Sequence, residues 1–343
     1  MNMKEIAEKA GVSVATVSYV LNGTGNVSQK KREEIMQIVG EEGYVPNRIA
    51  KSLRTKKSNT IGIMVEDITA FQTPRIINGI NEYAERHGYT VILNDMGLLK
   101  RVGKDFESIS RYKEIIEKGF QIFERAQVDG IIYVALHDRD VSQLLKPVGV
   151  PFVLAYCYDT GKKNYYVTYD NKNITKKAVQ HLIANNHTDI GLICGEESSK
   201  PAHQRYEGFR EAMEENHLTI NNDFIFPGDW EFESGRLAYE RYKKLMSKPT
   251  AIFAMNDLMA VGFIDAALDD GVRIPEDVSI IGFDNQEVCR FTRPRLTTVD
   301  LPLEAMGDEA GRLLLSLIRK EKVKEKKVVL DCRFVEKKSV AKR

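Results

Sequence analysis

Residues 3–22 read MKEIAEKAGVSVATVSYVLN, and this stretch decides how the rest of the chain is organised. The apolar spacing in residues 4–10 favours a short amphipathic helix. Gly11 then ends it, because glycine adopts the left-handed backbone of a tight turn at little cost. Ser13 can cap a second helix whose apolar residues recur at helical spacing. The pattern predicts a helix-turn-helix, which places its second helix in the major groove of DNA, or else an ordinary helical hairpin.

The segments that follow extend this pattern into a family resemblance. Residues 28–42 predict a third amphipathic helix, and residues 43–63 read GYVPNRIAKSLRTKKSNTIGI. Together with AGVSVATVSYVLNG at 10–23, this junction resembles the lactose-repressor (LacI/GalR) family of bacterial transcription regulators. The likeness covers essentially the whole chain. It implies a homodimer that binds double-stranded operator DNA and a small-molecule effector, most often a sugar or sugar derivative.

Composition and charge agree with a DNA-binding head on a larger body. The 343 residues suit two or three domains. Residues 1–58 carry ten Lys and Arg against six Glu, whereas the remainder carries 40 against 43 acidic residues. A basic head suits a polyanionic partner, and the alternative is a solvated charged face. No apolar run of about 18 residues is present and the chain starts with a charged helix, so we expect a cytoplasmic protein without membrane contact.

The four cysteines lie far apart in the sequence, so neither disulfides nor a zinc site is expected. We also expect no metal and no cofactor. No GxSxG, P-loop or HExxH pattern occurs, which argues against an enzyme. A solute-binding protein of the periplasmic sugar-binding type is the alternative function. It would need a signal peptide in place of the basic head.

From residue 59 onward, short β-branched runs alternate with helical segments, which predicts parallel sheets covered on both faces. The expected fold is α/β, with an all-α helix-turn-helix head and two doubly wound lobes of the periplasmic-binding-protein type. A ligand would bind between the lobes, outside the carboxyl ends of the strands. The expected parts are a head at 1–45, a hinge helix and linker at 46–58 and a core at 59–343, with lobe 1 at about 59–158 and 291–322 and lobe 2 at about 162–288 and 325–338. Expected helices of the first lobe are 72–87, 108–126 and 138–147.

The resemblance also implies which residues contact DNA. Val14, Ala15 and Tyr19 would face base edges; the first two suit apolar features such as a thymine methyl. Short polar groups would contact phosphates, and these positions are Thr16, Ser18, Asn22 and Tyr44. In the hinge, Arg48 would neutralise phosphates, and Asn47 is also expected to contact DNA. Ser18 and Asn22 equally suit capping and turn roles. Leu53 matches a leucine that enters the minor groove, and its alternative is packing against its two-fold mate.

For the effector, the resemblance points to strand ends and loops around the cleft. Arg205 and Asp284 could hold vicinal hydroxyls, or could form a structural ion pair. Trp230, the only tryptophan, suits a sugar ring but also suits a core position. The remaining expected effector contacts are Phe71, Gln72, Tyr156 and Asn256. Tyr156 stands where many relatives have an aspartate. The segment at 98–126 is about ten residues longer than is typical, and the tail at 333–343 lacks the leucine heptad of a lactose-repressor-like tetramer.

Overall fold

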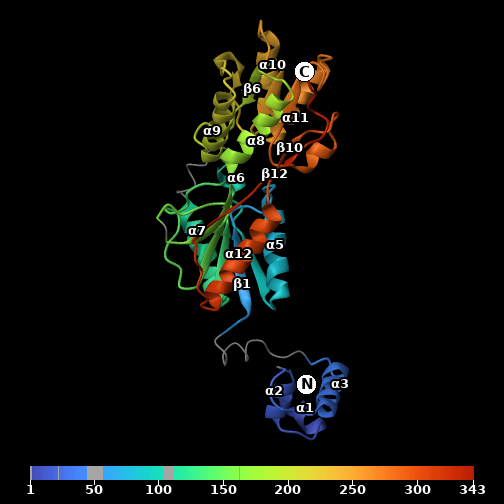
Figure 1. The fold of residues 1–343 in the computed structure, drawn as a ribbon. Helices are drawn as coiled ribbons and strands as arrows, with labels where there is room; N and C mark the ends of the chain where they lie inside the picture. The colour runs from blue at the N-terminus through green and yellow to red at the C-terminus, as the bar shows by residue number, and fades with distance from the viewer. Residues whose placement is uncertain (1, 22, 45–56, 103–111, 162) are drawn as a thin grey trace. The chain divides into compact units, whose positions relative to one another are not determined.

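A computed structural model describes residues 2–21, 23–44, 57–102, 112–161 and 163–343. The chain divides into two compact units, Met1–Ser58 and Asn59–Arg343, which we call the head and the core (Figure 1). The expected hinge helix, together with Asn22, Asn47, Arg48 and Leu53, lies outside the described residues.

The head is a three-helix unit made of α1 (Met3–Lys9), α2 (Val14–Leu21) and α3 (Gln29–Glu41). Gly11 has a φ of 62°, which forms the expected turn between α1 and α2. Ser13 caps α2, because its Oγ accepts a hydrogen bond from the Thr16 backbone N–H at 3.1 Å. Two cations of α3 hold the ends of the other helices: Lys31 donates to the Ala10 carbonyl at 3.0 Å, and Arg32 donates to the Val20 carbonyl at 3.5 Å. The head therefore has the predicted helix-turn-helix architecture.

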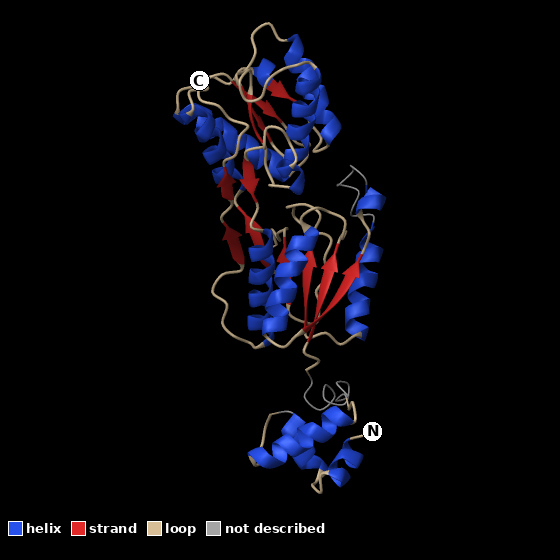
Figure 2. Cartoon of the chain, turned by 90° about the vertical axis from the view of Figure 1, so that its right-hand side faces the viewer, coloured by secondary structure: helices blue, strands red, loops and turns tan. Residues whose placement is uncertain are grey.

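The core begins with a six-stranded parallel sheet, here called the sheet of lobe 1 (Figure 2). In spatial order its strands are β11 (Lys327–Leu330), β5 (Tyr165–Tyr169), β4 (Phe152–Ala155), β3 (Gly130–Val134), β1 (Thr60–Val65) and β2 (Thr90–Asp95). Helices α5 (Thr73–Arg86) and α12 (Leu303–Ile318) pack together over one face of this sheet. Helix α7 (Lys113–Arg125) packs on the other face, and a short helix α6 (Leu99–Val102) precedes it.

Lobe 2 has a four-stranded parallel sheet of its own. Its strands, in spatial order, are β7 (Ile225–Phe226), β6 (Ile190–Ile193), β8 (Ala251–Ala254) and β9 (Ser279–Ile281). Its helices are α8 (Asn171–Ala184), α9 (Lys200–Glu215), α10 (Phe232–Lys244) and α11 (Asp257–Asp269), with short 3-10 helices η2 (Asn222–Phe224) and η3 (Glu287–Arg290). Helices α8 and α9 pack as one pair and α10 and α11 as another. Within the described ranges of the core, then, two α/β lobes are present, as predicted.

The lobe boundaries differ from those expected at three places. Strands β5 and β11, expected in lobe 2, pair with each other and join the sheet of lobe 1, with Lys327 opposite Tyr166. Residues 291–300, expected in lobe 1, lie along lobe 2, where Gly282 N–H donates to the Thr297 carbonyl at 2.9 Å. Strand β10 (Thr298–Asp300) then pairs antiparallel with β12 (Arg333–Val335). The chain therefore passes between the lobes after β5, after β10 and after β11.

Residues 138–147 form turns and a β-bridge instead of the expected helix. Arg139 is held by the buried carboxylate of Glu66, with nitrogen–oxygen distances of 2.7 and 3.0 Å. The carboxylate of Asp140 accepts hydrogen bonds from Ser142 and Thr160, so it competes with helical backbone pairing. These long-range partners override the local helical pattern.

The C-terminal tail after β12 is fixed on lobe 2. The Ser339 hydroxyl is buried, donates to the Ile280 carbonyl at 2.6 Å and accepts from Thr297 N–H at 2.8 Å. Both ring nitrogens of His187 are engaged as well, at Thr250 Oγ1 and the Ala341 carbonyl. Among the described residues, no helix combines the length and apolar character needed to span a membrane.

Candidate functional site

The head presents one face of α2 to solvent. Val17 and Val20 are buried against α1 and α3, and this orientation turns Val14, Ala15 and Tyr19 outward. Val14 is 40% exposed and Tyr19 is 50% exposed. This face of α2 is therefore available to a partner.

Local geometry supports the position of Tyr19. Gly25 has a φ of 74°, and a Cβ atom at this position would lie 2.7 Å from Cγ of Tyr19. The Tyr19 ring therefore packs against glycine backbone and extends past it.

The polar residues expected at phosphates are half-buried. The Thr16 hydroxyl is 2.9 Å from Ser13 Oγ, so it already has a partner inside the head. Ser18 and Tyr44 are also half-buried, and the Tyr44 ring packs against the head's small core.

A cavity of about 80 Å³ lies between the lobes of the core. Its lining from lobe 2 includes Ser199 and Pro201 at the start of α9, together with Arg205, Trp230, Asn256 and Asp284. Its lining from lobe 1 comprises Phe71, His137, Asp138, Tyr156 and Tyr169. Six of the seven expected effector residues thus meet at one cavity. Gln72 does not line it: its side chain is buried and donates to the Leu136 carbonyl at 2.8 Å.

Arg205 is the most connected group of this cavity. Its guanidinium is buried and donates to Asn171 Oδ1 at 2.9 Å, to the Tyr169 hydroxyl at 3.3 Å and to the Met255 carbonyl. The Phe283 ring lies 3.6 Å from its Cζ, a cation–π contact. Packing and hydrogen bonds therefore fix the guanidinium before any ligand arrives.

Asp284 faces Arg205 without a hydrogen bond between them. The Asp284 Oδ1–Arg205 Nη2 distance is 3.8 Å, longer than a hydrogen bond. Burial raises the pKa of Asp284 above its usual range, although the positive charge of Arg205 lowers it. Both groups thus keep hydrogen-bonding capacity toward the cavity.

Trp230 is positioned by its neighbours in lobe 2. Its backbone carbonyl accepts a hydrogen bond from Asn256 Nδ2 at 2.7 Å, while Asn256 Oδ1 caps α11 through Met259 N–H at 2.9 Å. A Cβ atom at Gly195 would lie 2.1 Å from the Trp230 ring, so only glycine fits beneath it. Trp230 is half-buried, so it is neither a core tryptophan nor a fully exposed one.

Three lining residues have left-handed backbone: φ is 59° at Tyr156, 73° at Trp230 and 111° at Asp284. Such conformations are costly for residues other than glycine and cluster at functional sites. Three such residues therefore lie together at this one cavity.

Sequence reasoning missed His137, Asp138 and Tyr169 on the lobe 1 wall. Glu66 holds the loop that carries the first two: besides Arg139, its carboxylate accepts from Leu136 N–H at 2.8 Å. Burial alone would raise the pKa of Glu66, but Arg139 and these hydrogen bonds together lower it. Burial raises the pKa of Asp138 to about 6 and lowers that of His137 to about 4. The available signal was the polar pair that follows the strand run DGIIYVAL.

Fold and sites together define a DNA-binding head joined to a ligand-binding core. Residues 2–47 match bacterial regulatory proteins of the lacI family, and residues 179–340 match the periplasmic binding protein-like domain. The HTH-type transcriptional repressor PurR of Vibrio parahaemolyticus is 32% identical over 331 residues, which are 95% of this chain and 94% of that protein. Catabolite control protein A of Priestia megaterium is 33% identical over 322 residues, 93% of each chain.

Solved structures agree with these relatives. The lac repressor dimer bound to operator and the anti-inducer ONPF has a TM-score of 0.80 at 26% identity and covers 99% of both chains. The complex of the transcriptional regulator CelR with cellobiose has a TM-score of 0.67 at 28% identity, with the same coverage. The chain belongs to the lacI family of bacterial regulatory proteins, and it is a DNA-binding transcription repressor and not an enzyme. The resemblance predicted from the sequence is thereby confirmed.

Proposed function

We propose that the protein represses transcription as a homodimer in the cytoplasm, under the control of a sugar or sugar derivative bound in the cleft. Two heads would bind the half-sites of a near-palindromic operator. Effector binding would change the angle between the lobes and hence the geometry of the two heads on DNA. The expected coupling is about 1–3 kcal/mol, the usual range for allosteric control.

The observation that carries the effector class is the facing pair of Arg205 and Asp284 beside the Trp230 ring. The 3.8 Å gap leaves a fixed donor and a fixed acceptor for neighbouring hydroxyls. The Trp230 ring lies 5.4 Å from the Arg205 guanidinium and offers an apolar face for a sugar ring. That the similar CelR structure is a cellobiose complex supports the same ligand class.

A fluorescence titration tests this class, because Trp230 is the only tryptophan. Mono- and disaccharides are added to the full chain, and the emission of Trp230 is followed. We expect at least one sugar to shift or quench this emission with saturation, and Asp284→Asn to weaken its binding at least tenfold. The matched control is Asp223→Asn, an exposed aspartate of the same lobe, which should bind as the wild type does. Saturable binding that is equal in both variants would place the sugar elsewhere.

In the head, we propose that Val14, Ala15 and Tyr19 read base edges, because these residues form the exposed face of α2. Thr16, Ser18, Asn22, Tyr44, Asn47 and Arg48 are proposed phosphate and sugar contacts, and Leu53 the minor-groove wedge. The family resemblance supports these roles for the hinge residues.

Dimerisation is proposed through lobe 2 as well as through DNA. Two large apolar side chains are exposed on the packed pair α10 and α11: Leu237 is 57% exposed and Leu268 is 46% exposed. Burial of these two side chains at a contact between two copies would be favourable, and this supports the proposal. Sedimentation velocity should show a dimer for the wild type and a monomer for Leu237→Glu/Leu268→Glu; a dimer in both would exclude this surface.

A further inference from the structure

A second cavity adjoins the cleft and shares Asp138 and Tyr169 with it. Its volume is about 330 Å³, within the range of roughly 300–1,000 Å³ that ligand pockets usually occupy, whereas the cleft cavity of 80 Å³ is below it. Tyr158 and Tyr166 of lobe 1 line it, together with the first residues of α8 and α9. A ligand in the cleft therefore has room to continue past Tyr169.

Two lysines give the second cavity a positive charge. Lys200 begins α9 and Lys327 begins β11, and within the described ranges neither lies within 4 Å of a carboxylate. A third lining lysine, Lys172, differs because Glu211 neutralises it at 2.7 Å. The two cations thus face the cavity with their charges available.

The acidic groups of the lining are already engaged. Asp170 caps α8, with its Oδ1 3.0 Å from the Asn173 backbone nitrogen. Asp138 is buried and accepts a hydrogen bond from the Thr168 hydroxyl at 3.0 Å. Asp170 keeps its charge, but it is directed to the N-terminus of α8, whose positive end offsets part of that charge. The two lysines, by contrast, have no carboxylate within 4 Å and can accept an anion as their partner.

Lys200 is held in place from the opposite lobe. Its Nζ lies 3.7 Å from the centroid of the Tyr158 ring, a cation–π contact between α9 of lobe 2 and a loop of lobe 1. The side chain of Ser199 makes no capping hydrogen bond at the start of α9, so the positive end of this 16-residue helix adds to the field of Lys200.

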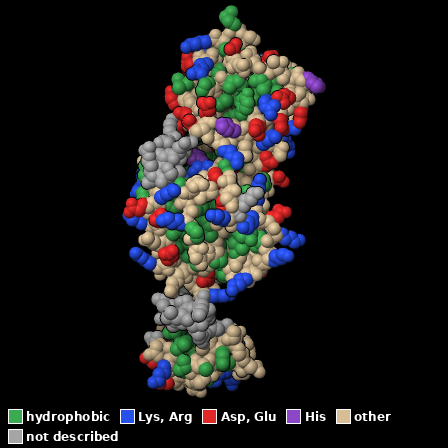
Figure 3. All heavy atoms as spheres, turned by 90° about the vertical axis from the view of Figure 1, so that its left-hand side faces the viewer, with side chains coloured by type: hydrophobic (Ala, Val, Ile, Leu, Met, Phe, Trp, Pro, Cys, Tyr) green, Lys and Arg blue, Asp and Glu red, His purple; other side chains and the backbone are tan. Residues whose placement is uncertain are grey.

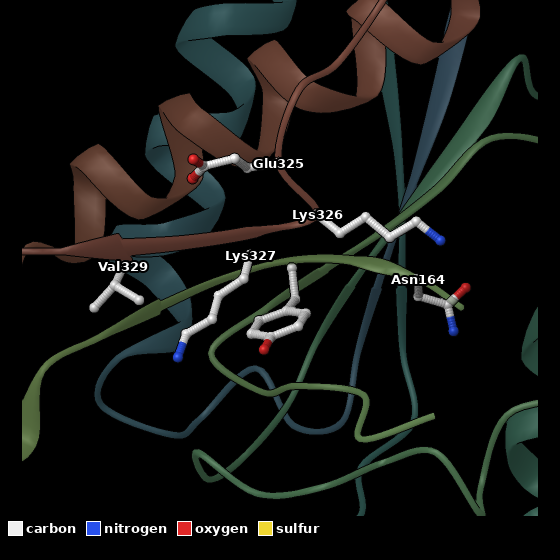
Figure 4. A pocket seen from close by; sticks show the side chains of 6 residues that line it. Asn164, Glu325, Lys326, Lys327 and Val329 are labelled. Atoms are coloured by element: carbon white, nitrogen blue, oxygen red, sulfur yellow. The ribbon is translucent and has the colours of Figure 1, made fainter. Parts of the chain in front are cut away.

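Lys327 lies between this cavity and a wider one of about 650 Å³ further along β11. Figure 4 shows Lys327 and Val329 on the same side of β11, with Glu325 directed away. The neighbouring Lys326 already donates to the Lys163 carbonyl at 3.2 Å. Figure 3 shows Lys and Arg side chains interspersed with Asp and Glu over this side of the core, so the surface as a whole has mixed charge.

We propose that the effector carries an anionic group, a phosphate ester or a carboxylate, which binds in the second cavity between Lys200 and Lys327. Its hydroxyl-bearing part occupies the cleft beside Arg205 and Asp284. This inference rests on the proposed function and narrows its ligand to acidic sugar derivatives. Because Lys200 belongs to lobe 2 and Lys327 to lobe 1, an anion between them contacts both lobes and favours one angle between them.

Inorganic phosphate is the first probe, since it requires no knowledge of the sugar. Its dissociation constant is measured on the full chain by ³¹P NMR titration for the wild type, for Lys200→Gln/Lys327→Gln and for the control Lys326→Gln. All three lysines are exposed, so the variants should fold. We expect the dissociation constant to rise at least fivefold in the double variant and to be unchanged in the control. Equal values in all three proteins, or no phosphate binding to the wild type, would overturn the proposal.

A matched set of ligands separates the two sources of the anion. Glucose, glucose 6-phosphate and glucuronate are titrated by calorimetry, and we expect one charged compound to bind at least tenfold more tightly than glucose. The double variant should lose that advantage while its affinity for glucose is unchanged. A tighter phosphate ester identifies a sugar phosphate, and a tighter glucuronate identifies a sugar acid.

The outcomes also separate this inference from the proposed function. Glucose that binds as tightly as both charged compounds, or an advantage that survives in the double variant, would overturn the anion site and leave sugar control intact. No binding of any sugar in the wild type, together with unaltered phosphate binding in the double variant, would overturn both.

Discussion

The recognition face of α2 and the cleft of the core are built in opposite ways. In the head, Val14 and Tyr19 are exposed and have few partners inside the unit. In the cleft, Arg205 and Asp284 are buried, and the guanidinium makes hydrogen bonds to three residues. One surface gains its partners only on binding, whereas the other is assembled in advance by the fold.

Substitutions on the recognition face of α2 should therefore change binding without changing stability, whereas substitutions in the cleft should change both. Exposed side chains contribute little to the free energy of unfolding, so their substitution changes recognition alone. Buried charged groups depend on their partners, so their substitution changes both.

The largest effect is expected for Arg205→Ala. It leaves the buried Met255 carbonyl without its donor and the buried Asp284 without the nearby positive charge, which should cost about 3–5 kcal/mol in the free energy of unfolding and abolish effector binding. Urea unfolding of the full chain measures the free energy of unfolding, and calorimetry measures effector binding. Arg210→Ala is the matched control, because Arg210 is on the same helix but pairs with Glu214 at the surface; its effect should stay below about 1 kcal/mol. Similar losses of stability in Arg205→Ala and Arg210→Ala would show that the cleft does not depend on Arg205 more than the surface depends on Arg210.

Asp138→Asn should change how stability depends on pH. Burial raises the pKa of Asp138 from 3.8 to about 6, so the folded protein binds this proton more tightly than the unfolded chain does. Its stabilising contribution is present below pH 4 and is lost as the pH rises through about 6. Between pH 4 and 7 the wild type should therefore lose up to about 3 kcal/mol relative to the variant. The control is Asp223→Asn, an exposed aspartate, for which the pH dependence of stability should match that of the wild type. The same match for Asp138→Asn would show that the fold does not raise the pKa of Asp138.

Gly195→Ala should displace the Trp230 ring, because a Cβ atom would lie 2.1 Å from it. Overpacking of this kind costs about 1–3 kcal/mol, and the Trp230 emission maximum should shift. The control is Gly149→Ala, where nothing lies within 4 Å of the added atom. An unchanged spectrum would mean that the ring is not seated on Gly195.

Tyr19→Ala should leave the free energy of unfolding within about 0.5 kcal/mol of the wild type, since the ring is half exposed. Its discrimination between operator and random DNA should fall about tenfold, the equivalent of about 1.4 kcal/mol. Lys30→Ala, an exposed cation of α3, should instead weaken binding to both DNAs equally. Equal losses for Tyr19→Ala would exclude it as a base reader.

Sequence reasoning placed the lobe 2 wall of the cleft better than the lobe 1 wall. Arg205, Trp230 and Asp284 could each be predicted from a short motif around them in the sequence, and all three line the cavity. Gln72 was expected there, yet it points to the Leu136 carbonyl, because the sequence of a loop does not fix which side chain faces inward.

Long-range pairing explains the rest of the difference. The helix expected at 138–147 is replaced by a loop that Glu66 anchors through Arg139, 73 residues away in the chain. Strand β5 joins lobe 1 because it pairs with β4, and β11, from the far end of the sequence, pairs with its other edge. Tyr169, the last residue of β5, thereby reaches the cavity. Local periodicity carries no information about such partners.

The most direct test of the account is the operator affinity of the full chain at fixed salt, with and without a compound that the Trp230 titration shows to bind. DNA from upstream of the protein's own gene serves as the operator, and fluorescence anisotropy gives the dissociation constant. The account predicts a change of about 5- to 150-fold in operator affinity, which Asp284→Asn should weaken while leaving DNA binding itself intact. A compound that saturates the cleft and leaves operator affinity unchanged would contradict it.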